Sequence, residues 1–187
     1  MYWWKKDSEP AKGFGDLLHR SKVPITLADL RLHDAPLIGV NEAFCRVTGY
    51  SADRVLGRNC RFLQPPGGPG PVRHRLRNFI YNDNLAEAKF VVPNVKADGT
   101  AFLNLLYMSK LKIGNKNVYI LGSQFEFTLH GDNGLEVYEA VLREDIRSLR
   151  TLGGELGVVM LRTYEQLASS HSIIANLRLM HGKGGIG

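Results

Sequence analysis

The chain has 187 residues, of which 44% are hydrophobic and 22% are charged. Values this close to the average of globular proteins exclude a disordered, collagen-like or low-complexity chain. The formal net charge of +6 comes from the first part of the chain, since residues 1–128 carry 18 basic against 11 acidic side chains and residues 129–187 carry 6 against 7.

The first 82 residues predict several short helices and two short strands. Gly49 ends one helix and Ser51 caps the next, while residues 65–71 hold four prolines and three glycines and must form a loop. In chain order, the expected elements are a helix at 14–22, strands at 25–28 and 37–40, helices at 41–49 and 51–56, and a basic helix at 71–82.

Three longer strand-like segments follow. They lie at 87–95, 101–112 and 117–127, and the turn signals Asp98-Gly99 and Gly114-Asn115 separate them. Pro93 indicates an edge position or a bulge in the first of them, because proline has no N–H for the sheet ladder. Two strands, short helices and then three antiparallel strands predict an α+β domain, with short helices on one face of a five-stranded antiparallel sheet.

Residues 132–181 predict helices instead of strands. Their apolar side chains recur mostly at steps of three and four residues, and Gly153-Gly154 interrupts the pattern. We therefore expect two helices, at about 134–151 and 155–181. One small sheet is too short to cover this apolar stripe, so packing against a second copy of the chain is the natural solution.

The expected organisation has three parts: an N-terminal cap helix within 1–22, a sheet-containing domain at 23–128, and a helical extension at 129–187 for dimerisation and signalling. The expected homodimer uses the C-terminal helices together with the N-terminal helix. Trp3 and Trp4 either join this interface or cap the sheet.

The sequence predicts neither export nor a membrane span. No apolar run approaches the roughly 20 residues that span a bilayer, and charges occupy residues 1–10, where a signal peptide has its apolar stretch. Two cysteines, Cys45 and Cys60, are too few for a disulfide framework or a four-cysteine metal site. We therefore expect a cytoplasmic protein that binds neither a membrane nor a metal.

A cluster of arginines without any acidic residue occupies positions 54–77. Because the cluster is confined to a short segment, it fits a small anionic ligand better than a nucleic-acid duplex, which needs a long basic stripe. We therefore expect no nucleic-acid partner. On charge alone, a solvated basic face explains the cluster equally well. Its members are Arg54, Arg58, Arg61, Arg73, Arg75 and Arg77.

The segment 57–64, GRNCRFLQ, places a thiol between Asn59 and Arg61. One interpretation is a cysteine in an electropositive pocket, ready for chemistry on a bound anionic cofactor. The other, which composition alone favours, is that Cys60 is a small buried hydrophobic side chain.

The sequence disfavours a hydrolase or a nucleotidyl enzyme. Its six histidines are scattered, and none has the setting of a base that would activate a thiol. CxxC and HxxxH zinc spacings are missing, and the glycine-rich tail at 182–187 lacks the preceding strand and the Ser or Thr of a phosphate-binding loop. We expect no enzymatic turnover.

GRNCRFLQ resembles the signature of LOV (light, oxygen or voltage) domains, the blue-light-sensing branch of the PAS superfamily. Further motifs occur in the family's order and nearly its spacing over about 23–128. They are Pro36-Leu37-Ile38, Asn41-Glu42-Ala43-Phe44, Thr48-Gly49-Tyr50, Asp98-Gly99-Thr100, Phe102 with Asn104-Leu105, and Leu121-Gly122-Ser123-Gln124. The chain departs from the family at Pro65-Pro66, where a small residue usually follows Gln64, at Ala35, where many members have asparagine, and at Leu106, where many have phenylalanine.

The resemblance implies an FMN cofactor and a thiol, Cys60, that bonds reversibly to flavin C4a after blue-light absorption. It implies that Gln124 transmits the signal, because an amide can rotate when flavin N5 changes from acceptor to donor. Arg61 and Arg77 match the arginines that clamp the flavin phosphate, with Arg73 assisting. The other residues that the resemblance assigns to the cofactor are Thr26, Asn59, Gln64, Leu76, Ile80, Asn94, Asn104, Leu106, Met108, Ile120 and Gly122.

The resemblance also implies a PAS/LOV fold and a blue-light photoreceptor similar to the short LOV proteins of bacteria. Such a protein would signal through its helical extensions and the state of its homodimer, to a downstream protein that no motif identifies. The alternative is a flavin-binding PAS redox or ligand sensor in which Cys60 is incidental.

Overall fold

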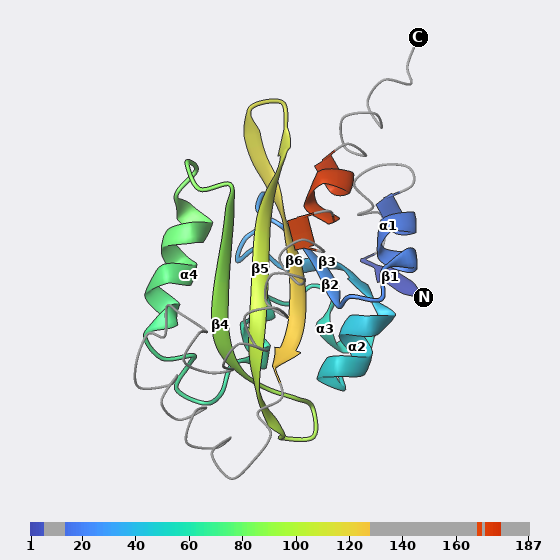
Figure 1. Ribbon diagram of the computed structural model, residues 1–187, viewed down its shortest axis with the longest axis vertical. Helices are drawn as coiled ribbons and strands as arrows, with labels where there is room; N and C mark the ends of the chain where they lie inside the picture. Colours follow the sequence, from blue (N-terminus) through green and yellow to red (C-terminus); the bar gives the residue numbers. More distant parts are fainter. Residues whose placement is uncertain (6–13, 128–167, 170, 177–187) are drawn as a thin grey trace, which may run out of the picture.

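Figure 1 shows one sheet flanked by short helices. The computed structural model describes residues 1–5, 14–127, 168–169 and 171–176. Its strands are β1 (Tyr2–Trp4), β2 (Ile25–Asp29), β3 (Leu37–Asn41), β4 (Glu87–Val95), β5 (Ala101–Ile113) and β6 (Lys116–Phe127). They form a six-stranded antiparallel sheet in the order β1-β3-β2-β6-β5-β4. The predicted α+β fold is confirmed, and the sheet has six strands rather than the predicted five.

The additional strand is β1, which the sequence did not predict because three residues are too few to show a period-two pattern. It pairs with β3 and places Trp4 opposite Gly39. A Cβ at Gly39 would collide with the Trp4 ring, so the glycine makes room for the indole. Trp4 packs on one face of the sheet and Trp3 on the other. Both tryptophans therefore cap this edge, and a role for them in a dimer interface stays a prediction.

The helices lie close to the predicted positions. They are α1 (Phe14–Arg20), α2 (Glu42–Thr48), α3 (Ala52–Val55), the 3₁₀ helix η1 (Cys60–Leu63) and α4 (Val72–Tyr81). Gly49 ends α2 with a φ of 75° and donates its N–H to the Cys45 carbonyl, as expected of a left-handed C-cap. Ser51 occupies the N-cap position of α3, but its side chain bonds to the Asp53 carboxylate instead of capping the helix.

The face of the sheet that carries α2, α3, η1 and α4 is the inner face. Two apolar clusters cover it. One gathers Phe44, Val55 and Leu63 over β3, and the other joins Phe79 of α4 to Phe90 and Ile120 of the sheet. Since these clusters lie over different strands, the space between them is where a cavity can form.

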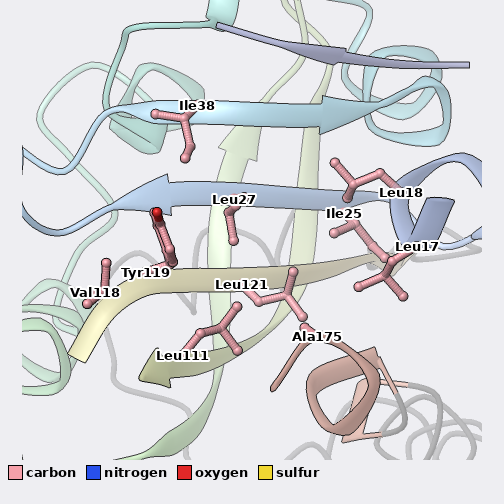
Figure 2. Close-up of a cluster of buried hydrophobic side chains, with 10 residues drawn as sticks. All are labelled: Leu17, Leu18, Ile25, Leu27, Ile38, Leu111, Val118, Tyr119, Leu121 and Ala175. Atoms are coloured by element: carbon pink, nitrogen blue, oxygen red, sulfur yellow. The ribbon is translucent and has the colours of Figure 1, made fainter. Parts of the chain in front are cut away.

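The opposite, outer face packs against α1 (Figure 2). Leu17 and Leu18 of α1 meet apolar residues of β2, β5 and β6. Ala175 joins the same cluster from the helical residues 171–176, which fall within the predicted helix 155–181. The predicted helix 134–151 and the rest of 155–181 lie outside the described residues. Among the helices of the described ranges, none is both long and apolar enough to cross a membrane.

Asn41 connects three elements near the start of the domain. Its side-chain oxygen accepts the Phe44 N–H at 3.0 Å, which caps α2, and the Ile25 N–H at 2.9 Å, which fixes β2. Its amide nitrogen donates to the Val23 carbonyl at 2.8 Å. Because Asn41 is only 1% exposed, water cannot replace these bonds.

Asn41→Ala is therefore expected to lower the free energy of unfolding by about 2–4 kcal/mol, since it removes a cap and leaves buried backbone groups without partners. Urea unfolding followed by circular dichroism measures the change. Asn82→Ala is the control. The Asn82 side-chain oxygen accepts the Asn84 N–H in an exposed hydrogen bond, which water can replace. Equal losses in the two variants would contradict the role of Asn41.

Candidate functional site

A cavity of about 310 Å³ lies on the inner face, between α4, η1 and the strands. All the residues assigned to a cofactor from the sequence line it except Gln124, and Cys60 lines it as well. They are Thr26, Asn59, Cys60, Arg61, Gln64, Arg73, Leu76, Arg77, Ile80, Asn94, Asn104, Leu106, Met108, Ile120 and Gly122. Residues from opposite ends of a 97-residue stretch thus meet in one place, as Thr26 and Gly122 do directly across β2 and β6.

Cys60 begins η1, and the preceding residue holds it there. The Asn59 side chain accepts the Arg61 N–H at 3.0 Å and so caps this short helix. Burial raises the pKa of the Cys60 thiol to about 12, so the thiol is protonated at neutral pH. Burial also raises the pKa of Cys45, on α2, to about 11. Both cysteines pack against the Phe44 cluster, but only Cys60 lines the cavity.

The arginine cluster divides into two groups of three. Arg61, Arg73 and Arg77 line the cavity from η1 and α4, and we call this its arginine end. Each of the other three lies over an aromatic ring outside the cavity lining. They are Arg54 over Tyr50 at 5.8 Å, Arg58 over Phe62 at 4.8 Å and Arg75 over Phe90 at 5.4 Å. The structure thus separates three cavity-lining arginines from three that lie over aromatic rings outside the lining.

The sheet side of the cavity carries a buried amide network. Asn104 donates its side-chain N–H groups to Asn94 at 3.0 Å and to Gln124 at 3.1 Å. Gln124 donates in turn to the Thr26 hydroxyl at 3.5 Å. Gln124 therefore lies behind the lining and reaches the cavity through Asn104 and Thr26.

Asn104 has an unused hydrogen-bonding atom within this network. Its side-chain oxygen is buried and has no partner among the described residues. Buried acceptors in proteins are nearly always paired, so an unpaired one in a cavity wall marks a place where a ligand can donate an N–H.

Gly122 keeps the cavity open next to β2. A Cβ at this position would lie 2.7 Å from the Thr26 hydroxyl and 3.6 Å from Leu106. Both of these residues line the cavity, so any side chain at 122 would take up space between them. Glycine here suits a flat ligand packed against the strand.

Five lining residues were missed from the sequence. They are Ala28, Ala35, Leu37, Tyr81 and Val92. Strand alternation gives the signal for two of them, because Ala28 is two residues from Thr26 on β2 and Val92 two from Asn94 on β4. Within the described residues, no three histidine, cysteine or acidic side chains converge as a metal site would require.

Residues 24–128, more than half of the chain, match the family model of the PAS domain. This chain belongs to the PAS family. Blue-light-activated histidine kinase 2 of Erythrobacter litoralis is 42% identical over 104 residues, which are 54% of this chain and 29% of that kinase.

Solved structures place the chain in the LOV branch. The LOV domain of a blue-light activated histidine kinase from Erythrobacter litoralis matches with a TM-score of 0.53 at 39% identity, over 58% of this chain and 98% of that one. The Rhodobacter sphaeroides LOV protein matches with a TM-score of 0.60 at 27% identity, over 91% of this chain and 95% of that one. The chain therefore contains a LOV domain.

The likeness to histidine kinases covers less than a third of their length. This LOV chain spans 25%, 31% and 29% of the length of the three blue-light-activated histidine kinases from Brucella anthropi, Rhizobium johnstonii and Erythrobacter litoralis. Their names thus support light sensing by the shared domain, and kinase activity is not carried over to this chain.

Proposed function

We propose that this LOV domain is a blue-light photoreceptor that holds FMN in its cavity. The observation that carries the proposal is the arrangement of three kinds of group around one cavity: the arginine end, the buried amides on the strands, and the Cys60 thiol on η1. FMN has the matching parts, namely a phosphate, a ring edge with donors and acceptors, and a flat apolar ring. Blue-light sensing by the relatives supports the same reading.

The residues present fit FMN at each part of the molecule. Arg61 and Arg77 would hold the phosphate, since a guanidinium donates two parallel hydrogen bonds to one phosphate, and Arg73 would assist. The unpaired Asn104 oxygen would accept an N–H from the ring edge, with Asn94 beside it. Asn59 and Gln64 would bind the ribityl chain and the ring edge. The apolar wall that would pack on the ring comprises Leu76, Ile80, Leu106, Met108 and Ile120, with Thr26 and Gly122 between them.

Flavin, when bound, supplies the excited state that makes its C4a atom reactive towards a thiol under blue light. Cys60 is the thiol that we assign to this reaction. Its sulfur would form the bond to C4a and its proton would pass to N5, so no external base is required. The raised pKa of Cys60 fits this role, because the thiol keeps its proton until the reaction begins. The Asn59 cap holds η1, and with it Cys60, in a fixed position, and the reaction depends on such placement of the thiol.

The absorption spectrum of the purified chain tests the proposed function. Bound FMN is expected to absorb blue light, to bleach on illumination and to recover in darkness, and the flavin released on denaturation identifies the cofactor. A chain that binds flavin without reversible bleaching would instead be the redox or ligand sensor of the alternative interpretation. A chain that binds no flavin would contradict both.

Gln124 is the residue that we propose as the transmitter to the rest of the protein. Its amide accepts from Asn104 and donates to Thr26, so it can exchange donor for acceptor by rotating. It lies on β6, which runs to residue 127, shortly before residues 129–187, for which the sequence predicts a helical extension. We propose that this extension, with the N-terminal helix, forms a homodimer that light weakens.

Gln124→Leu is expected to bleach like the unmodified chain while showing a smaller light-induced change in sedimentation. A coupling of about 1–3 kcal/mol would alter the dimer constant about 5- to 150-fold in the unmodified chain. A chain truncated at residue 130 is the control and should be monomeric yet photoactive. An unmodified chain that stays monomeric in darkness and in light, at micromolar concentrations, would contradict the dimer switch.

A further inference from the structure

The arginine end of the cavity includes a carboxylate that the proposed function does not use. Asp34 lies in the loop between β2 and β3, and its carboxylate accepts a hydrogen bond from Nη1 of Arg61. Its backbone oxygen accepts a second bond from the Asn59 side chain. The next residue, Ala35, lines the cavity together with Asn59 and Arg61. An acidic side chain therefore binds an arginine that would hold an anionic ligand.

The loop holds Asp34 in this position through its own backbone. Asp34 and Ala35 have φ values of 68° and 44°, so two consecutive residues other than glycine adopt the left-handed conformation. The Ala35 N–H donates to the Leu32 carbonyl at 3.1 Å and closes the turn. Asn59 fixes the other side, because it binds Asp34 with its nitrogen and Arg61 with its oxygen. Asp34, Asn59 and Arg61 thus form one connected set.

The Asp34 carboxylate occupies Nη1 of Arg61, which is one of the donors that a phosphate bound at the arginine end would use. The side chains of Arg61 and Asp34 are 58% and 42% exposed, so water screens their ion pair and a stronger anion can displace it. Hydrogen bonding to Arg61 lowers the pKa of Asp34, which is therefore ionised at neutral pH and repels a second anion nearby. The unphosphorylated flavin, riboflavin, would not meet this competition.

We propose that Asp34 is a specificity-determining residue, whose carboxylate competes with the flavin phosphate for Arg61 and limits the preference of this LOV domain for FMN over riboflavin. This inference deepens the proposed function and rests on it. It requires only that the phosphate lie at the arginine end, and it makes no demand on Cys60 or on light.

Asp34→Asn tests this role with the smallest change. Asparagine has the same shape, can still accept from Arg61, and adopts the left-handed conformation readily, so the variant removes the charge and keeps the turn. Asp53→Asn is the matched control, because it changes the net charge by the same amount. Asp53 is an exposed residue of α3 and does not line the cavity. The full chain is equilibrated with FMN and riboflavin in competition, the bound flavins are separated by chromatography, and thermal unfolding verifies the fold of each variant.

Asp34→Asn is expected to bind FMN on the order of three- to tenfold more tightly, with riboflavin affinity unchanged. Asp53→Asn should leave both affinities unchanged. A loss of FMN affinity in Asp34→Asn would show that the carboxylate orients Arg61 for the phosphate, and an equal gain in Asp53→Asn would show a general field effect. Either result overturns the inference while the proposed function stands. An unmodified chain that binds neither flavin would overturn the proposed function itself.

Discussion

Replacing Cys60 with alanine is expected to leave FMN bound and to abolish the reversible bleaching of its blue absorption. The loss should be complete, because alanine offers no sulfur for the bond to flavin C4a. Binding should persist, since the arginine end and the buried amides are contributed by other residues. Absorption spectra before, during and after illumination, at equal flavin loading, measure the effect.

Cys45→Ala is the matched control for this variant. Both thiols are protonated at neutral pH, because burial raises the pKa of each, but Cys45 packs beside Phe44 and does not line the cavity. Its variant should bleach and recover like the unmodified chain. Persistent bleaching with the same slow recovery in Cys60→Ala, or its loss in Cys45→Ala, would show that the wrong thiol is assigned.

Arg77→Ala is expected to weaken FMN binding about tenfold to a hundredfold, which corresponds to about 1.5–3 kcal/mol for a charge-assisted contact. Arg77 lines the arginine end from α4, so the loss should fall on the phosphate contact alone. Riboflavin affinity should therefore stay nearly constant. Parallel titrations of the full chain with FMN and with riboflavin measure both values.

Arg54→Ala is the control, because Arg54 lies over the Tyr50 ring and does not line the cavity. It should leave both affinities unchanged. Arg61→Ala should lower FMN affinity less than Arg77→Ala, since Nη1 of Arg61 is already bonded to Asp34. Equal losses in all three variants would indicate a diffuse basic field in place of a phosphate clamp.

The elements that the sequence predicted well are those with a local signal. Gly49 ends its helix with a left-handed cap, and the long strands β4, β5 and β6 are separated by the turn signals Asp98-Gly99 and Gly114-Asn115. β1 was missed because its stability comes from pairing with β3 and from the space above Gly39, which are both distant in sequence. Contacts of this kind produce no periodic pattern in the amino-acid sequence.

The same distinction applies to the candidate site. Most of the lining residues were identified through resemblance to LOV domains, and neither charge nor spacing alone separated Arg61 from Arg58. The position of Gln124 behind Asn104 and the contact of Asp34 with Arg61 required the folded chain. Asp34 is 27 residues from Arg61, and the left-handed turn of its loop together with the Asn59 side chain holds the two side by side.

The two edges of the sheet have a consequence for how the molecule can assemble. One edge is β1, which offers only three residues of backbone, and the other is β4, where Pro93 has no N–H to offer a neighbouring strand. Short strands and prolines at edges discourage the edge-to-edge addition of strands from another molecule. Concentrated preparations should therefore resist fibril growth through continued extension of this sheet, and at these two edges the pairing of copies by backbone hydrogen bonds is disfavoured.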